Sequence, residues 1–521
     1  MTDAAALSQA VAPGYRFDGP ALELGALMAD AETLTDVHIR IPVGMLNRHG
    51  LVAGATGTGK TKTLQLMAEQ LAAAGVPVFA ADVKGDLSGL SAPGEPGDKL
   101  LARTQAVGQD WQARGFAVEY YALGGDGTGI PVRVTMESFG PTLLSKVLNL
   151  NATQESSLGL VFHYAAQRDL ELVDLADLRA VVQHLVSDEG KADLKDLGGL
   201  SAATAGVILR NLIAFADAGA DRFFGEPAFD VADLLRTAGD AGVISLMELP
   251  RLQDRPLVFS TFLMWLLGEL FRTLPEVGDV DRPKLVFFFD EAHLLFDDAS
   301  EAFLDQITQT VRLIRSKGVG VFFVTQSPTD VPAEVLGQLG SRVQHQLRVN
   351  TPNDAKALKL TVNTYPTSSY DDLGAVIQTL GIGEAIVTVM NERGAPTPVA
   401  WTRLRAPESL MGPAETAAME AAVKASPTYA KYAEVTEVDS AADRLAAQKP
   451  AAQKAEPGSP APADDHVTVD LPEQPRPRSS SKSAKKKDDD NVLEQVVKSS
   501  AFKSAMNTAT RELMKGLFRR R

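Results

Sequence analysis

The sequence predicts an α/β fold with a mainly parallel central sheet. Patterns of buried strands alternate with helical patterns over residues 46–134 and 238–405. Early in the first range, a strand (LVAG), a helix (KTLQLMAEQLAAAG) and a second strand (VPVFAAD) follow one another with short connections. Because neighbouring parallel strands need a crossover between them, this order indicates a sheet covered by helices on both faces.

Four other segments differ from this core in composition. Residues 1–45 form a short N-terminal element that ends in the strand pattern VHIRIPV. Residues 135–237 are rich in Leu and Ala, which predicts a mainly helical insertion. Residues 406–490 are rich in Pro, Ala, Ser and charge, which predicts a disordered, low-complexity linker. The pattern of apolar and basic residues over 491–521 predicts a basic amphipathic helix. This helix is expected either to dock on its own protein or to contact nucleic acid or a membrane surface.

Composition excludes several classes of chemistry. The 521 residues contain no cysteine, so disulfides, thiolate-bound zinc, iron–sulfur clusters and thiol nucleophiles are excluded. The absence of a secretory signal pattern and of an apolar run near 18 residues predicts a cytoplasmic protein without a membrane span. The net charge of −15 opposes binding to a polyanion unless positive charge is concentrated locally.

A glycine-rich loop between the first strand and helix matches the phosphate-binding pattern GxxxxGK[ST]. Its glycines allow left-handed backbone angles that turn N–H groups toward phosphate oxygens, and the helix that follows adds its positive N-terminal end. The lysine reaches the β- and γ-phosphates, and the last threonine binds Mg²⁺. The predicted nucleotide-binding residues are Gly54, Ala55, Thr56, Gly57, Thr58, Gly59, Lys60 and Thr61.

Two carboxylates follow the apolar strand in KLVFFFDE. Asp290, at the carboxyl end of a central strand beside the phosphate loop, is predicted to hold Mg²⁺. Glu291 is predicted to orient and deprotonate the attacking water. His293 is assigned no metal.

Two further strand ends are expected at the same edge of the sheet. Gln326 follows the strand in GVGVFFVTQ, where its amide is placed to contact the γ-phosphate or the attacking water, although polar residues there can also simply cap the strand. Asp82 ends VPVFAAD and is predicted to line the site or join the metal shell, and the segment Lys84–Asp86 follows it. Because the carboxyl ends of parallel strands meet at one edge, these residues are expected to converge.

Several long segments resemble the HerA/FtsK superfamily of ATPases, and in particular its bacterial HerA-like group typified by YjgR. They are RHGLVAGATGTGKT, DVKGD, KLVFFFDEAHLLF and RLIRSKGVGVFFVTQSPTDVP, within a likeness that covers roughly residues 15–413. The resemblance implies a RecA-like P-loop NTPase core, hydrolysis of ATP with Mg²⁺, and a ring, usually a hexamer, that moves DNA or pairs with a nuclease.

The resemblance also suggests arginines that act across a subunit boundary. Arg315, in IRSKG, and Arg48, in NRHG, are the candidates, because a guanidinium can meet the charge that spreads over the transition state. The chain departs from better-known HerA helicases in one respect. Only 53 residues precede Gly54, so the large N-terminal β-barrel of those helicases is absent or reduced.

The function expected from the sequence is an ATP-driven motor that acts on DNA. A ring would multiply a modest positive charge in each chain around its pore. Two alternatives remain open, a motor that moves polypeptide cargo and a nucleotide-gated assembly scaffold. The intact acid pair argues against a scaffold that does not hydrolyse ATP.

Overall fold

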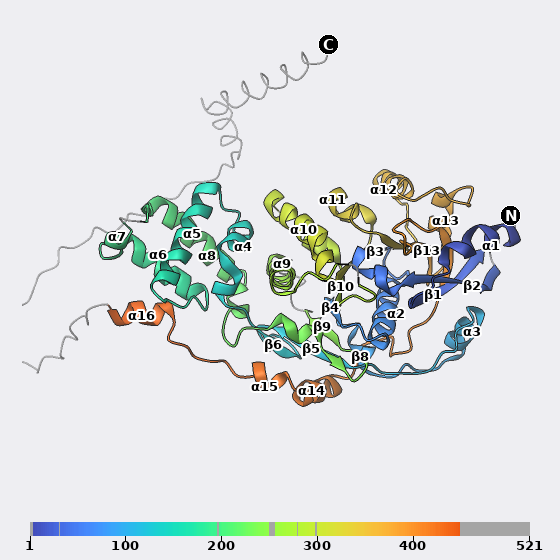
Figure 1. Cartoon of the computed structure of the whole chain (residues 1–521), viewed down its shortest axis with the longest axis horizontal. Helices are drawn as coiled ribbons and strands as arrows, with labels where there is room; N and C mark the ends of the chain where they lie inside the picture. Colours follow the sequence, from blue (N-terminus) through green and yellow to red (C-terminus); the bar gives the residue numbers. More distant parts are fainter. Residues whose placement is uncertain are drawn as a thin grey trace, which may run out of the picture. The chain divides into compact units, whose positions relative to one another are not determined.

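The computed structural model describes residues 4–30, 32–194, 197–249, 256–278, 280–296 and 300–448. A sheet of twelve strands runs through this part of the chain (Figure 1). Its strands are β1 (Ala21–Ala29), β2 (Glu32–Pro42), β3 (Gly50–Ala53), β4 (Val78–Asp82), β5 (Val118–Leu123), β6 (Ile130–Val132), β9 (Ile244–Glu248), β10 (Leu285–Phe289), β11 (Val319–Thr325), β12 (Ser341–Gln344), β13 (Glu384–Thr388) and β14 (Ala400–Leu404). Strands β7 (Thr237–Ala238) and β8 (Ala241–Gly242) form a separate small hairpin.

The sheet is parallel over most of its width. Its strand order is β2-β1-β14-β13-β12-β3-β11-β10-β4-β9-β5-β6, and all strands from β12 to β6 run parallel. Strands β13, β14, β1 and β2 add an antiparallel edge. Every residue of β3, β4, β10 and β11 is buried, as expected for parallel strands with helices on both faces. The predicted α/β class with a mainly parallel sheet is confirmed.

The register of the central strands brings their carboxyl ends to one edge. Ala53 of β3 pairs with Thr325 of β11, and Phe289 of β10 pairs with Phe323 of β11. Strand β11 therefore lies between β3 and β10, so the strands that carry the phosphate loop and the acid pair are about 10 Å apart, two strand spacings.

Helices cover both faces of this sheet. Figure 1 shows α2 (Lys60–Ala73) and α10 (Glu301–Ile314) on opposite sides, and both contact β11. The other helices in the core region of the sequence are α1 (Ala4–Val11), α3 (Asp98–Ala106), α9 (Pro256–Thr273), α11 (Ala333–Leu336), α12 (Pro352–Val362) and α13 (Leu373–Thr379). None of the helices within the described ranges is both long enough and apolar enough to cross a bilayer.

The Leu- and Ala-rich region between residues 135 and 237 forms a group of helices. They are α4 (Met136–Val147), α5 (Ala152–Gln167), α6 (Leu175–Val186), α7 (Gly190–Asp193) and α8 (Ala202–Asp217). Local sequence explains two of the starts, because Asn151 with Gln154 and Asp174 with Asp177 form capping boxes. Helix α4 packs against α9 and α10, which joins this group to the core (Figure 1).

The first part of the predicted linker is folded, which corrects the expectation for residues 406–448. This segment contains α14 (Thr416–Ala425), α15 (Tyr429–Tyr432) and α16 (Ala441–Gln448), which contact β5, β6 and α6 respectively. Its apolar residues are sparse but they are buried, and Tyr432 packs with its ring centroid 5.3 Å from that of Phe229. The composition of the segment hid these anchors, because average hydrophobicity does not register a few well-spaced contacts. The remainder of the predicted linker and the basic helix expected at 491–521 lie outside the described residues.

The N-terminal element is part of the main sheet. Strands β1 and β2 pair with each other, and β1 pairs with β14. The short element predicted over 1–45 therefore extends the sheet of the core instead of forming a barrel of its own, over the residues that the structure describes there.

Candidate active site

The loop from Gly54 to Gly59 has the backbone that phosphate binding requires. Gly54, Gly57 and Gly59 have φ angles of 155°, 82° and 113°, which L side chains rarely adopt. A Cβ atom on Gly54 would also lie 2.4 Å from the Cβ atom of His345. The loop leads directly into α2, so the positive N-terminal end of that helix adjoins the loop.

Lys60 is held inside this loop. Its side chain is buried, and its Nζ atom donates hydrogen bonds to the carbonyl oxygens of Gly54 (2.6 Å) and Ala55 (3.2 Å). Burial lowers the pKa of the Lys60 ammonium, while the charges of Glu291 and Asp290 act in the opposite direction. The phosphate loop and the acid pair therefore lie within electrostatic range of each other.

Asp290 directly follows β10 and is almost completely buried. Its Oδ1 atom accepts a hydrogen bond from the N–H of Glu291 at 2.9 Å. Its Oδ2 atom is buried without a hydrogen-bond partner among the described residues. Burial, with the neighbouring charge of Glu291, raises the pKa of Asp290 to about 7. A buried carboxylate oxygen without a partner is suited to a cation or its bound water.

Glu291 occupies a tight turn after Asp290, with φ at 49° in the left-handed region. Its Oε1 atom accepts a hydrogen bond from Nζ of Lys84, and its Oε2 atom lies 3.3 Å from Nδ1 of His293. Burial favours the neutral carboxyl group, but the hydrogen bond and charge of Lys84 outweigh it and hold the pKa of Glu291 below its ordinary value. Glu291 is therefore a carboxylate at neutral pH, as a base must be.

Asp82 ends β4 and organises the loop that carries Lys84. Its Oδ1 atom accepts hydrogen bonds from the N–H groups of Lys84 (3.2 Å) and Gly85 (2.7 Å), and its Oδ2 atom accepts one from Leu87 (2.8 Å). Both oxygens are engaged by the backbone, so direct metal binding would require these bonds to break. The contacts support a positioning role for Asp82.

Thr325 and Gln326 take different positions at the end of β11. Oγ1 of Thr325 donates to Oδ2 of Asp330 at 2.7 Å, so Thr325 stabilises the turn after the strand. The side chain of Gln326 is exposed at the carboxyl end of β11, between the phosphate loop strand and the acid pair strand. This is the position in which a contact with the γ-phosphate was predicted.

Arg48 and Arg315 lie at the other edge of the sheet. Arg48 ends the short helix η2 (Val43–Arg48) before β3, and Arg315 begins η7 (Arg315–Lys317) before β11. Since β11 has seven residues, Arg315 is about 20 Å from the carboxyl end of that strand. Neither arginine is placed to reach the phosphate loop of its own chain, which leaves the predicted role across a subunit boundary.

Two residues at the carboxyl edge of the sheet, Glu248 and His345, were missed from the sequence. Glu248 ends β9 beside Asp82, and burial with the charge of Asp82 raises its pKa to about 8. His345 directly follows β12, is fully buried, and has Nε2 2.9 Å from Oγ1 of Thr63 on α2. Burial and the charge of Lys60 lower the pKa of His345 to about 3. The sequence signal that could have identified Glu248 and His345 is their position at the ends of strands, which also identified Asp82 and Asp290.

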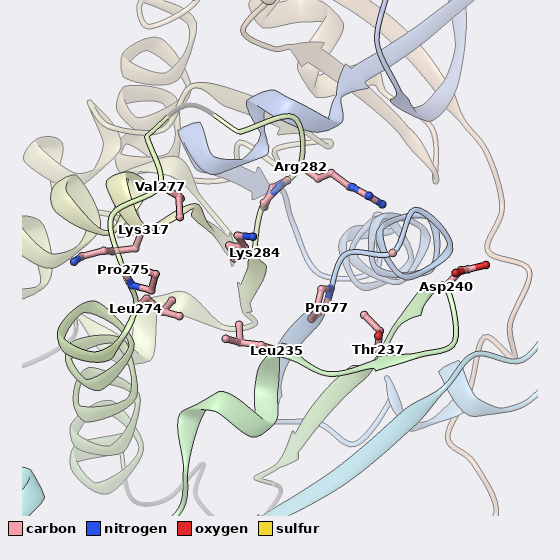
Figure 2. Close-up of a pocket in the computed structure, with 12 residues that line it drawn as sticks. Pro77, Leu235, Thr237, Asp240, Leu274, Pro275, Val277, Arg282, Lys284 and Lys317 are labelled. Carbon is pink, nitrogen blue, oxygen red and sulfur yellow. The ribbon is translucent and has the colours of Figure 1, made fainter.

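A separate cavity of about 770 Å³ opens at the amino ends of the strands. Pro77, Lys284 and Lys317, which line it, precede β4, β10 and β11 (Figure 2). The cavity therefore lies at the sheet edge opposite the phosphate loop. Arg282 adds a third basic side chain, and Asp240 contributes an acidic one.

The residues at the carboxyl edge fit a nucleoside triphosphate with magnesium. The glycine backbone offers N–H groups, Lys60 offers a cation, and Asp290 offers an oxygen without a partner. The half-buried Thr61 lies in the first turn of α2, where its hydroxyl can join Asp290 in holding the metal.

The fold of this chain is similar to that of a solved structure. The bacterial conjugative coupling protein TrwBdeltaN70 has a TM-score of 0.50 and 16% identity, with 77% of this chain and 93% of that chain covered. TrwB in complex with ADP and Mg²⁺ has a TM-score of 0.48 and 16% identity, with 78% and 100% covered. VirB4 of Thermoanaerobacter pseudethanolicus has a TM-score of 0.47 and 15% identity, with 75% and 97% covered.

The family is shown by the sequence comparison. No curated protein matches the chain in sequence. The family model described as helicase HerA-like C-terminal matches residues 28–520, which is most of the chain. The chain therefore belongs to this HerA-like family, a group of P-loop ATPases of the HerA/FtsK superfamily.

Proposed function

We propose that this protein hydrolyses ATP with Mg²⁺ and uses the energy to move DNA through a ring of identical subunits. One observation carries the proposal. The phosphate loop with Lys60 and the acid pair Asp290–Glu291 lie at the same sheet edge, within electrostatic range of each other. The glycine backbone and the unpartnered oxygen of Asp290 support ATP·Mg²⁺ as the ligand.

The hydrolytic step follows from the residues of this chain. Loop N–H groups bind phosphate oxygens, and Lys60 exchanges the carbonyls of Gly54 and Ala55 for the β- and γ-phosphates. Thr61 and Asp290 hold Mg²⁺, which would supply positive charge to the phosphate oxygens. Glu291 accepts the proton of the water whose oxygen bonds to the γ-phosphorus, while the bond from that phosphorus to the β–γ bridging oxygen breaks and ADP leaves.

In the proposed mechanism, two further kinds of side chain assist hydrolysis. Gln326, exposed between the two strands, orients the attacking water or the γ-phosphate. Arg315 or Arg48 of one subunit enters the site of the next, where its guanidinium stabilises the transition-state charge. Their location at the opposite sheet edge agrees with action between subunits and not within one.

DNA is the proposed track because the family resemblance favours it and because a ring multiplies local positive charge. The net charge of −15 favours a second candidate, a motor that moves a polypeptide. The third candidate is a nucleotide-gated scaffold, and the arrangement of Glu291 for hydrolysis argues against it.

ATP hydrolysis measured with duplex DNA, single-stranded DNA, RNA or buffer alone tests this proposal. We expect DNA to raise the rate, and the increase to fade as salt is raised from about 50 to 300 mM, because phosphate contacts release counterions. The variant Glu291→Gln serves as the inactive control. A hydrolysis rate that none of the nucleic acids changes would support the polypeptide motor or the scaffold instead. Absence of hydrolysis in the wild type would overturn the ATPase proposal.

A further inference from the structure

We propose that Lys84 distinguishes ATP from ADP by exchanging its contact with Glu291 for a contact with the terminal phosphate. The inference rests on the proposed function, because it assumes that the carboxyl edge binds a nucleotide. It assigns a binding role to a residue other than those of the phosphate loop, the acid pair and Gln326.

The fold brings Lys84 to the acid pair from a distant part of the sequence. Strand β4 pairs with β10, so the residues that follow these strands meet at the same edge. Nζ of Lys84 donates a hydrogen bond to Oε1 of Glu291, although the two residues are 207 positions apart. The N–H of Lys84 is anchored on Asp82, and the side chain extends from this fixed backbone.

The two partners differ in their exposure. The Lys84 side chain is 42% exposed, whereas that of Glu291 is 9% exposed. Lys84 can therefore swing toward an incoming ligand while Glu291 stays in place. Its long side chain keeps the ammonium mobile without moving the backbone.

The ammonium of Lys84 also lies in the field of the phosphate loop. Its charge acts on Lys60, and Glu291, Asp290 and Asp86 act on it. The ammonium groups of the two lysines are thus close enough to influence each other, one carried by the loop after β4 and the other by α2. A γ-phosphate bound by Lys60 carries about two negative charges, more than the single charge of Glu291.

The exchange has a chemical consequence at Glu291. In the nucleotide-free chain Lys84 occupies Oε1, and His293 lies against Oε2. Departure of Lys84 toward the phosphate frees Oε1 to accept a proton from water. ADP lacks the γ-phosphate, so it leaves the pair with Glu291 intact. Lys84 would thereby link the presence of the third phosphate to a free base.

Nucleotide affinity measures this role without relying on hydrolysis. We would titrate ADP and the non-hydrolysable β,γ-imido analogue of ATP, each with Mg²⁺, into the full chain. In Lys84→Ala we expect the analogue to bind about fivefold or more weakly, and ADP to stay within about twofold, because only the analogue loses a charge-assisted hydrogen bond. Lys84→Arg should recover part of the loss, and the exposed Lys356→Ala on α12 serves as the matched control.

A double-mutant cycle tests the exchange itself. Glu291→Gln should strengthen binding of the analogue, both by removing a repulsive charge and by releasing Lys84. In the Lys84→Ala background only the first effect remains, so the gain should be smaller by about threefold or more. Equal gains in the two backgrounds would show that Lys84 does not leave Glu291 for the phosphate, and would overturn the proposal.

The other outcomes separate this inference from the proposed function. A wild-type protein that binds neither nucleotide would overturn the ATPase proposal and this inference with it. A wild type that binds both, with a Lys84→Ala variant whose ratio of the two affinities is unchanged, would overturn this inference alone. If Lys84→Ala does not fold, as judged by its circular dichroism and melting, Lys84→Met gives the same test with more of the side chain retained.

Discussion

At the residue scale, the site contains two buried charges of opposite sign, those of Lys60 and Glu291. Lys60 is buried against backbone carbonyls, and Glu291 is buried against Lys84 and His293. Each charge is kept by its partners in spite of burial. The site is therefore charged and organised before the substrate arrives.

We predict that Lys60→Ala and Glu291→Gln each lower the rate of ATP hydrolysis by about a hundredfold or more, since each removes a group that acts on the transferred phosphate or the attacking water. Steady-state phosphate release measures the effect. The exposed Glu334→Gln on α11 is the control, with a rate expected to match the wild type. Intact hydrolysis in either variant would contradict the roles assigned to these residues.

The buried carboxyl group of Glu248 predicts a pH dependence of stability. Burial raises its pKa from 4.5 to about 8, so the folded chain binds this proton more tightly than the unfolded chain. The contribution of Glu248 to the free energy of unfolding is fully present below about pH 4.5 and is lost as the pH rises through about 8. We expect the melting temperature of the nucleotide-free protein to fall between pH 6 and pH 8.5, and to fall less in Glu248→Gln. An unchanged slope in the variant would contradict this assignment. Asp82 and Asp290 contribute slopes of the same sign, because burial raises the pKa of each.

At the scale of elements, helix α2 links the phosphate loop to the end of β14. Its buried residues Gln65 and Glu69 bind the segment that follows that strand. Glu69 accepts hydrogen bonds from the N–H groups of Glu408 (2.8 Å) and Ser409 (3.0 Å), and Nε2 of Gln65 donates to Oγ of Ser409 (2.6 Å). Helix α2, which carries Lys60 in its first turn, is thus held by hydrogen bonds to residues more than 300 positions away in the sequence.

The segment with α14, α15 and α16 should contribute measurably to stability. The hydroxyl of Tyr432 donates to Oδ2 of Asp233 and accepts from the N–H of Asp230, and the ring is buried against Phe229. We predict that Tyr432→Phe destabilises the protein by about 1 kcal/mol and Tyr432→Ala by about 3–5 kcal/mol. Thermal melting of both variants measures this order. The exposed Lys424→Ala on α14 is the control, and equal stability of all four proteins would show that this segment is not docked.

At the scale of the whole molecule, the phosphate loop and the candidate arginines lie at opposite edges of one sheet. This arrangement suits a head-to-tail ring, in which the arginine edge of one subunit faces the nucleotide edge of the next. Arg48 and Arg315 lie at the sheet edge opposite the phosphate loop of their own chain.

Mixing two inactive variants tests this arrangement. Arg315→Ala keeps the phosphate loop, and Lys60→Ala keeps the arginine. If Arg315 acts between subunits, random co-assembly restores about one active interface in four, and hydrolysis should return toward a quarter of the wild-type rate. Mass measurements with ATP confirm that assemblies are present. Assemblies without any recovery would contradict a role of Arg315 in trans, and the same experiment with Arg48→Ala would then test the second candidate.

The sequence by itself determined the α/β class, the phosphate loop and the acid pair at a strand end, because these depend on local backbone angles, on the start of a helix and on strand periodicity. Only the tertiary structure decided that β11 separates β3 from β10, that Lys84 binds Glu291, that Asp82 holds the Lys84 loop, and that residues 406–448 dock on the core. The linker expected there was wrong because a few buried side chains, such as Tyr432, outweigh an average composition. These features join residues that are far apart in the chain, and their energy comes from contacts and burial that exist only once the sheet has formed.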